Sequence, residues 1–188
     1  MNTLQLLVFI IIDLYGLILV LRAWFQFSRV DFYNPISQSL VKITQPVLSP
    51  LTTFIPTVKN INLAALLLAF LLFSLKFPLA HVVGNLFIGN ADILDYAIIG
   101  MLTLVRTVGK AIFYVLLIGA VMSWFNRGAT PLQFILAQLS EPLLRPIQRI
   151  LPNTGMIDFS PMVLAVILFL LNSLLGDLFD VYWALASY

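Results

Sequence analysis

The chain has 188 residues, of which 61% are apolar and only 10% are charged, and its formal net charge is +2. Soluble domains contain roughly 45–50% apolar and about 25% charged residues, so this composition excludes an ordinary water-soluble domain and predicts an all-α integral membrane protein. The absence of cysteine excludes disulfides and thiolate metal sites, and a single histidine, His81, makes a histidine-built metal centre improbable. The small net charge of +2 predicts no nucleic-acid partner. We also expect no cofactor and no enzymatic activity, because no nucleophile–base pair or metal cluster can be assembled from these residues.

Four segments are long and apolar enough to cross a bilayer, which requires about 20 residues. They run from about Leu4 to Phe25, from Leu63 to about Val83, within Ile93–Phe125, and from Pro161 to about Leu175. We expect the membrane part of the third segment to be its C-terminal two-thirds, ending at Trp124. An alternative is a separate fifth helix at Ile93–Val105, which would invert the second half. Tyr182 and Trp183 are expected to be interfacial aromatics.

Charged residues between the spans predict the orientation. The two long connections are basic, whereas the loop near Gly89 and the C-terminal tail are acidic; the residues are Arg29, Lys42, Lys59, Arg127, Arg145 and Arg149 against Asp92, Asp95, Asp177 and Asp180. The positive-inside rule therefore places both long connections in the cytoplasm and both termini outside. Arg106 and Lys110 fall in the outer half of the third span, where we expect them to snorkel outward or to pair with the acidic loop.

The sequence contains an internal repeat, formed by residues Asn34–Pro56 and Thr130–Pro152. Four prolines of each copy coincide at one offset, and Asn62 then matches Asp158; the prolines are Pro35, Pro46, Pro50 and Pro56, and Pro131, Pro142, Pro146 and Pro152. We therefore expect two parallel repeats, residues 1–91 and 92–188. Each would contain a span, a cytoplasmic segment and a second span.

Each cytoplasmic segment has the pattern of an amphipathic helix. Asn34 and Thr130 are favourable N-caps, and the proline that follows each suits the first helical position. Apolar and polar residues alternate at helical spacing, and the internal prolines are expected to break each segment into two short helices. We expect proline-hinged hairpins that lie on the inner leaflet with the apolar face toward lipid.

The second copy carries more charge than the first and provides a candidate docking face. This docking face is defined as Glu141, Pro142, Arg145, Pro146, Gln148, Arg149 and Pro152. In one interpretation it binds an acidic partner or anionic lipid. In the other it is a solvated surface beside the lipid headgroups, where each basic residue contributes about 1 kcal/mol.

These residues carry a family resemblance over nearly the whole chain. Arg22 and Trp24 end the first span, Asn34 precedes Pro35, the run E-P-L-L-R-P-I-Q-R-I-L-P fills Glu141–Pro152, and I-D-F-S-P contains Asp158, Ser160 and Pro161; Trp124 matches Trp24 in the second copy. The chain thereby resembles the YggT (YlmG-like) family of small membrane proteins. Two departures are Met122 in place of a second arginine, and N-L-A-A after Ile61 in place of D-F-S-P.

The resemblance implies a non-enzymatic protein of the bacterial plasma (inner) membrane. Branches of the family are connected with osmotic-stress tolerance and ion balance, with septum placement, or with assembly of membrane-bound cytochromes in plastids. The shared role that this implies is a membrane scaffold. Its partners would be membrane lipids and a further membrane protein or a second copy of the chain.

Asp13, Lys76 and Asn172 are polar residues within the predicted spans. Asp13 is near the middle of the first span, where a carboxylate costs about 2.5–3.5 kcal/mol, and Lys76 on the antiparallel second span lies at a similar depth. Lys76 aligns with Asn172 of the second copy. One interpretation is a buried pair and an interhelical hydrogen bond that stabilise the bundle. The alternative is an oligomeric ion channel or transporter component that uses Asp13 and Lys76.

Overall fold

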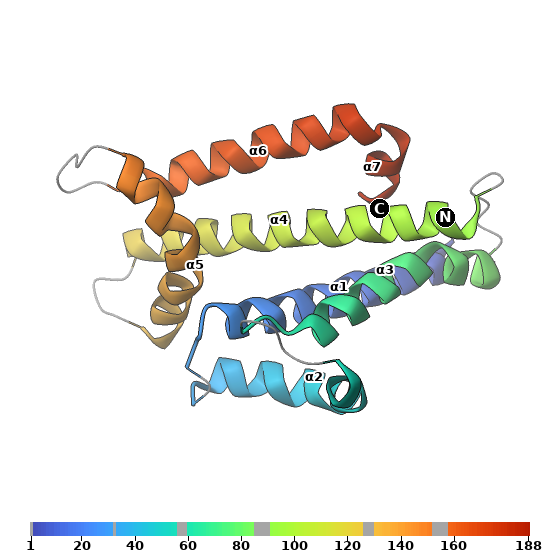
Figure 1. The fold of residues 1–188 in the computed structure, drawn as a ribbon, viewed down its shortest axis with the longest axis horizontal. Coiled ribbons are helices and arrows are strands. Elements are labelled where there is room, and N and C mark those ends of the chain that lie inside the picture. Colours follow the sequence, from blue (N-terminus) through green and yellow to red (C-terminus); the bar gives the residue numbers. More distant parts are fainter. Residues whose placement is uncertain (1, 32, 56–59, 85–90, 126–129, 152–157) are drawn as a thin grey trace.

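The computed structural model describes residues 2–31, 33–55, 60–84, 91–125, 130–151 and 158–188, without the side chains of residues 123–125. The described chain is helical throughout, which confirms the predicted fold class (Figure 1). The elements are α1 (Thr3–Phe27), α2 (Pro35–Phe54), α3 (Leu63–Gly84), α4 (Ile93–Phe125), α5 (Pro131–Ile150), α6 (Ser160–Phe179) and α7 (Val181–Leu185).

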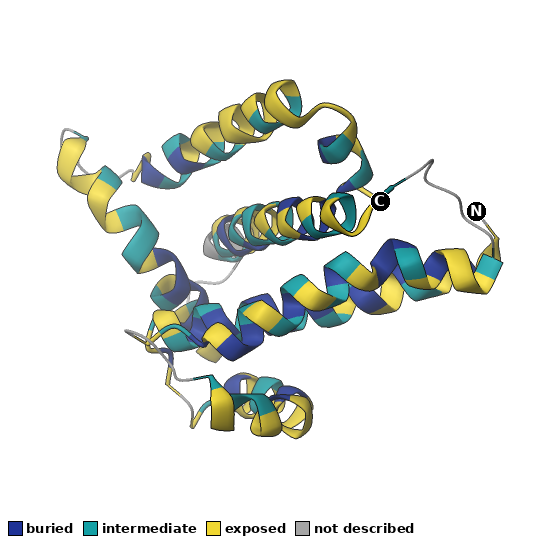
Figure 2. Cartoon of the chain, turned by 45° about the vertical axis from the view of Figure 1, so that its right-hand side comes forward, coloured by how far each residue is buried: buried dark blue, intermediate teal, exposed yellow. Residues whose placement is uncertain are grey.

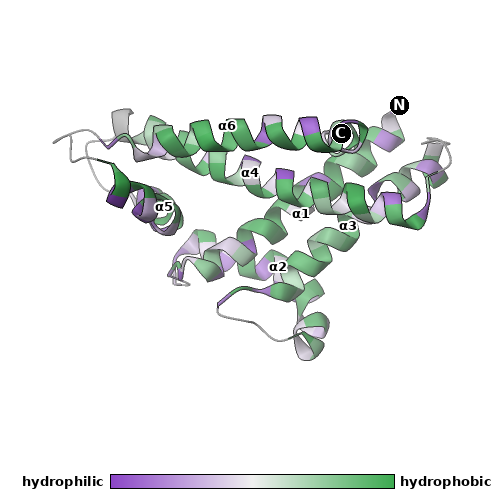
Figure 3. Cartoon of the chain, turned by 45° about the horizontal axis from the view of Figure 1, so that its top comes forward, coloured by the Kyte–Doolittle hydropathy of each residue, from purple (hydrophilic) through white to green (hydrophobic). Residues whose placement is uncertain are grey.

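Within the described ranges, four helices are long and apolar enough to cross a membrane, namely α1, α3, α4 and α6. They indicate a multi-pass membrane protein, and they match the four predicted spans. Helix α4 is continuous from Ile93 to Phe125, so the alternative of a separate helix at Ile93–Val105 is wrong. Figure 3 shows hydrophobic residues along the long helices and more frequent hydrophilic residues on α2 and α5.

The two halves of the chain point in the same direction, as parallel repeats require. Helices α1 and α4 run one way and α3 and α6 run the other way, so that both termini lie near one end of the bundle (Figure 1). Helix α2 joins the end of α1 to the start of α3, and α5 joins the end of α4 to the start of α6. The two amphipathic helices therefore belong to the end that is opposite to the termini.

The halves nevertheless pack differently. Helices α1 and α3 share a close-packed core, in which Gly16 lies against the ring of Phe73 and the small side chains of Ala65 and Ala69 are buried. Helix α4 packs on α3 and α1. Helix α6 stands at the edge, and only Ser160 and Leu164 of its 20 residues are buried (Figure 2).

The internal prolines bend the amphipathic helices without dividing them. Helices α2 and α5 each continue for 20 residues through two prolines, so the prediction of two short helices in a hairpin is wrong. Figure 1 shows both helices changing direction along their length. A proline removes one backbone hydrogen bond and displaces the carbonyl four residues earlier. Because the two prolines of each helix are four residues apart, both losses fall on one side, and the bonds of the other side persist.

Candidate docking site

The N-terminal caps of both amphipathic helices form as predicted. The Asn34 side chain accepts a hydrogen bond from the backbone N–H of Ile36 at 3.0 Å, and Pro35 begins α2. In the second copy, Thr130 and Gln133 form a reciprocal capping box, and Pro131 begins α5. These caps satisfy backbone donors at the start of each helix, and they fix the residue at which each amphipathic face begins.

Helix α2 presents three distinct faces. The face toward the bundle contains Ser37, Thr44 and Leu48, all of which are buried. A second face is apolar but exposed, since Ile36, Ile43 and Val47 retain 41%, 53% and 43% of their accessible surface. The third face is polar and carries Gln38, Gln45 and Ser49, at a spacing of seven and then four residues. Helix α2 therefore leaves an apolar and a polar face uncovered, on opposite sides of the helix.

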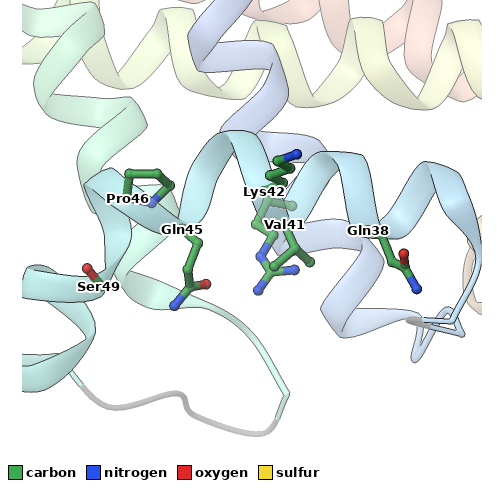
Figure 4. A pocket seen from close by; sticks show the side chains of 7 residues that line it. Gln38, Val41, Lys42, Gln45, Pro46 and Ser49 are labelled. Atoms are coloured by element: carbon green, nitrogen blue, oxygen red, sulfur yellow. The ribbon is translucent and has the colours of Figure 1, made fainter.

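The polar face of α2 borders an open groove, the α1–α2 groove, with a volume of about 620 Å³ (Figure 4). The lining residues are Arg22 from α1 and Gln38, Val41, Lys42, Gln45, Pro46 and Ser49 from α2. Two cationic side chains beside amide and hydroxyl groups can bind an anion or a carboxylate. This groove was not predicted from the sequence, although the row of polar residues at helical spacing was a signal for it.

The apolar face of α5 is covered by protein, unlike that of α2. Ile135, Leu136 and Leu139 pack with Phe25 and Val30 of the first repeat, and Val115 of α4 completes the cluster. At the matched repeat position, Leu139 is 2% exposed whereas Ile43 is 53% exposed. The expectation that both segments place an apolar face on lipid is therefore wrong for α5, because α5 covers the junction between the two repeats.

The polar side of α5 carries the predicted docking face. Arg145 Nη2 lies 2.6 Å from Glu141 Oε1, and both side chains are more than half exposed. Gln148 donates a hydrogen bond to Asp158 Oδ2 at 2.9 Å, which links the end of α5 to the start of α6. Arg149 is exposed. The prolines Pro142 and Pro146 lie within the helix, whereas Pro152 and its counterpart Pro56 lie outside the described residues.

The remaining motif residues have structural positions. Asp158 Oδ1 accepts from the backbone N–H of Ser160 at 2.9 Å, and Pro161 follows in the first turn of α6. The hydrogen bonds from Ser160 and Gln148 hold the pKa of Asp158 below its usual value. At the start of α3, the side chain of Asn62 accepts a hydrogen bond from the backbone N–H of Ala65 at 3.0 Å.

The two motif tryptophans differ in what the structure describes. The side chain of Trp24 packs against the cores of both repeats, whereas the side chain of Trp124 lies outside the described residues.

Of the three intramembrane polar residues, only two come together. Lys76 Nζ lies 2.6 Å from Asp13 Oδ1 and 4.7 Å from the centroid of the Phe9 ring. The Lys76 side chain is 2% exposed and that of Asp13 is 42% exposed. The predicted pair of α1 and α3 therefore forms. Asn172 lies elsewhere, in a groove between α4 and α6, so the three residues do not line one pathway.

Arg106, in the N-terminal half of α4, contacts the C-terminal segment rather than the acidic loop. Arg106 donates to the backbone carbonyl of Trp183 at 2.9 Å, and its guanidinium lies 5.0 Å from the centre of that indole ring. Trp183 is 7% exposed, so its ring packs against protein. The hydroxyl of Tyr182 donates to Asp95 at 2.7 Å. Helix α7 thus folds back onto α4, and Trp183 binds Arg106. Tyr182 binds Asp95, an acidic residue that was expected to be a partner of Arg106.

The repeat architecture agrees with a known family. The family model for CCB3/YggT proteins matches residues 1–83 and 98–179, one segment in each repeat. The chain belongs to this family. Each matched segment contains a long helix, an amphipathic helix and a second long helix.

Relatives within the family cover almost the whole chain. An uncharacterised protein of Haemophilus influenzae is 51% identical over 178 residues, which are 94% of this chain and 93% of that protein. The uncharacterised protein YggT of Escherichia coli strain K12 is 46% identical over 173 residues, 92% of this chain and 88% of that protein. The uncharacterised protein PA0392 of Pseudomonas aeruginosa is 36% identical, over 86% of this chain and 82% of that protein. No solved structure matches the chain.

Proposed function

We propose that this CCB3/YggT-family chain is a non-enzymatic scaffold of the bacterial plasma membrane. The observation that carries this proposal is the exposure of polar side chains on both amphipathic helices at one end of the bundle. Lys42 is exposed beside the α1–α2 groove, and Arg145 and Arg149 are exposed on the docking face. Cationic surfaces on capped, packed helices are suited to holding an acidic partner segment. By holding that partner, the protein would support osmotic-stress tolerance, septum placement or the assembly of a membrane complex.

The orientation in this proposal places α2 and α5 in the cytoplasm and both termini outside. Its support is the basic charge of both long connections. The chain has no native cysteine, so a cysteine introduced at Lys42 or at Asp92 reports the side of the membrane. Position 92 should react with an impermeant reagent in intact cells and position 42 should not. Labelling at position 42 from outside would invert the assignment.

Charge reversal on the docking face tests the scaffold function. Arg145→Glu with Arg149→Glu should abolish activity in an osmotic-stress complementation assay while the protein still inserts into membranes. The control is Ser39→Glu with Thr53→Glu, which adds two negative charges at exposed positions of α2 that do not line the α1–α2 groove. Equal loss in both variants would indicate a general effect of negative charge. Wild-type activity of the α5 variant would reject the docking face.

The ion pair within the spans motivates a second candidate, an oligomeric ion channel or transporter component. The pair favours a structural role more than a conducting one, because Lys76 is buried and lies against the Phe9 ring. Purified protein in liposomes should show no ion flux under an imposed potential. A flux that Asp13→Asn abolishes would favour the conduit over the scaffold.

A further inference from the structure

A second groove lies within the membrane-spanning part of the molecule, between α4 and α6. This α4–α6 groove has a volume of about 540 Å³. Its polar lining residues include Arg106 and Lys110 from α4 and Asn172 from α6, and aliphatic and aromatic side chains such as Phe113 and Phe169 make up most of the remainder. The groove therefore has mainly apolar walls and two cationic side chains, Arg106 and Lys110, which are one helical turn apart on α4.

Lys110 is the charged residue of the groove that has no ion-pair or hydrogen-bond partner in the part of the chain that the structure describes. Arg106 is bound to the carbonyl and the ring of Trp183. Lys110 is exposed, and among the described residues it forms neither an ion pair nor a hydrogen bond. Charged side chains within a span normally face the protein interior, line a cavity or pair with another group. Lys110 is therefore available to a negatively charged group from outside this chain.

The depth of Lys110 restricts what that group can be. Lys110 is near the middle of the 33-residue helix α4, about 25 Å along the axis from Ile93 and about 23 Å from Phe125. When α4 is centred in a hydrocarbon core about 30 Å thick, a phospholipid phosphate lies about 15 Å or more from Lys110 along the membrane normal. This arrangement places Lys110 deeper than the outer-half position expected from the sequence. A carboxylate at this depth is most readily supplied by an acidic side chain on a transmembrane helix.

The groove has room for the backbone of such a helix. A Cβ atom added at Gly109 would meet nothing within 4 Å, and Gly109 lines the groove next to Lys110. Small residues allow transmembrane helices to approach closely, and an amide such as Asn172 can donate or accept across the contact. Phe169 of α6, which also lines the groove, is 70% exposed, so the α6 wall is uncovered as well.

We propose that the α4–α6 groove receives a transmembrane helix of a partner protein, with a mid-span Asp or Glu paired to Lys110. A second copy of this chain is less suitable, because Asp13, its acidic residue near the middle of a span, is already bound to Lys76. The proposal adds a partner class to the scaffold function. It uses a site separate from the docking face, so that either can fail alone.

The test uses a defined probe in place of the natural partner. The full chain is reconstituted in phosphatidylcholine vesicles with a synthetic Leu-rich helix of about 23 residues that has one central Glu. Association is measured by fluorescence energy transfer. The Glu peptide should bind about tenfold more tightly than an all-apolar control peptide. Lys110→Met should remove that difference, Lys110→Arg should retain it, and Lys42→Met, which removes a lysine outside the groove, should leave it unchanged.

Three results would overturn the proposal. The first is equal binding of the two peptides, or a preference for Glu that survives in Lys110→Met. The second is self-association of the chain that Lys110→Met abolishes, which would assign the groove to a second copy. The third is retention of phosphatidylglycerol that depends on Lys110, measured by native mass spectrometry, which would assign the groove to lipid.

Discussion

Asp13→Asn separates a structural role of the buried ion pair from a conducting role. The substitution keeps the shape of the side chain and removes the charge that lies 2.6 Å from Lys76. Lys76 is 2% exposed, so its ammonium group would remain buried without an opposite charge. Removing one partner of a buried pair costs about 3–5 kcal/mol, and we expect about 3 kcal/mol here because Asp13 is 42% exposed.

The second half of the experiment is the double variant Asp13→Asn with Lys76→Met. Methionine fills the space of the lysine stem and contacts the Phe9 ring without a charge. Replacing both charges by neutral groups is often neutral for stability, so the double variant should recover most of the lost free energy of unfolding. Reversible unfolding in detergent micelles measures all three proteins. If Asp13→Asn costs less than about 1 kcal/mol, or the double variant remains as unstable as the single one, the reasoning is refuted.

Three further predictions follow from the matched repeats and from the helix contacts. Leu139→Ala should lower the free energy of unfolding by about 2–5 kcal/mol because the Leu139 side chain is buried. Ile43→Ala, at the equivalent but exposed position of α2, should lower it by less than about 1 kcal/mol. Similar losses in the two variants would contradict the difference in burial between α5 and α2. Gly16→Ala should destabilise the chain by about 1–3 kcal/mol, since the new methyl group would collide with the aromatic ring packed on it, and an unchanged unfolding midpoint would contradict that packing. The lowered pKa of Asp158 means that its charged form stabilises the fold at neutral pH and that this contribution is lost as pH falls through the lowered pKa. Asp158→Asn should therefore narrow the difference in Tm between about pH 6 and about pH 3, and an unaltered difference would count against the contribution.

Features that depend on local pattern could be predicted from the sequence. Spans follow from apolar length, and caps follow from a polar residue before proline, as at Asn34 and Thr130. The Asp13–Lys76 pair could also be predicted, because a charge within a span needs a partner and Lys76 lies at a similar depth on the antiparallel neighbouring span.

Features that depend on tertiary packing could not be predicted in the same way. Nothing in the amphipathic pattern distinguishes Ile43 from Leu139, because both occupy the apolar stripe of a helix of the same length. The difference arises only when Phe25 and Val30 of the first repeat reach α5. The position of Trp183 likewise depends on the reversal of the chain after α6. The continuity of α2 and α5 depends on how many hydrogen bonds remain beside each proline.

The unequal covering of α2 and α5 means that the two halves are no longer interchangeable. A protein built from two first halves would place Ile43 where Leu139 seals the junction, and a β-branched side chain would have to fill a space shaped for leucine. A protein built from two second halves would place Arg145 and Arg149 at the positions of Ser49 and Thr53. The two repeats have therefore diverged in structure. The first keeps the apolar face of α2 exposed, and the second buries the apolar face of α5 at the contact between the repeats.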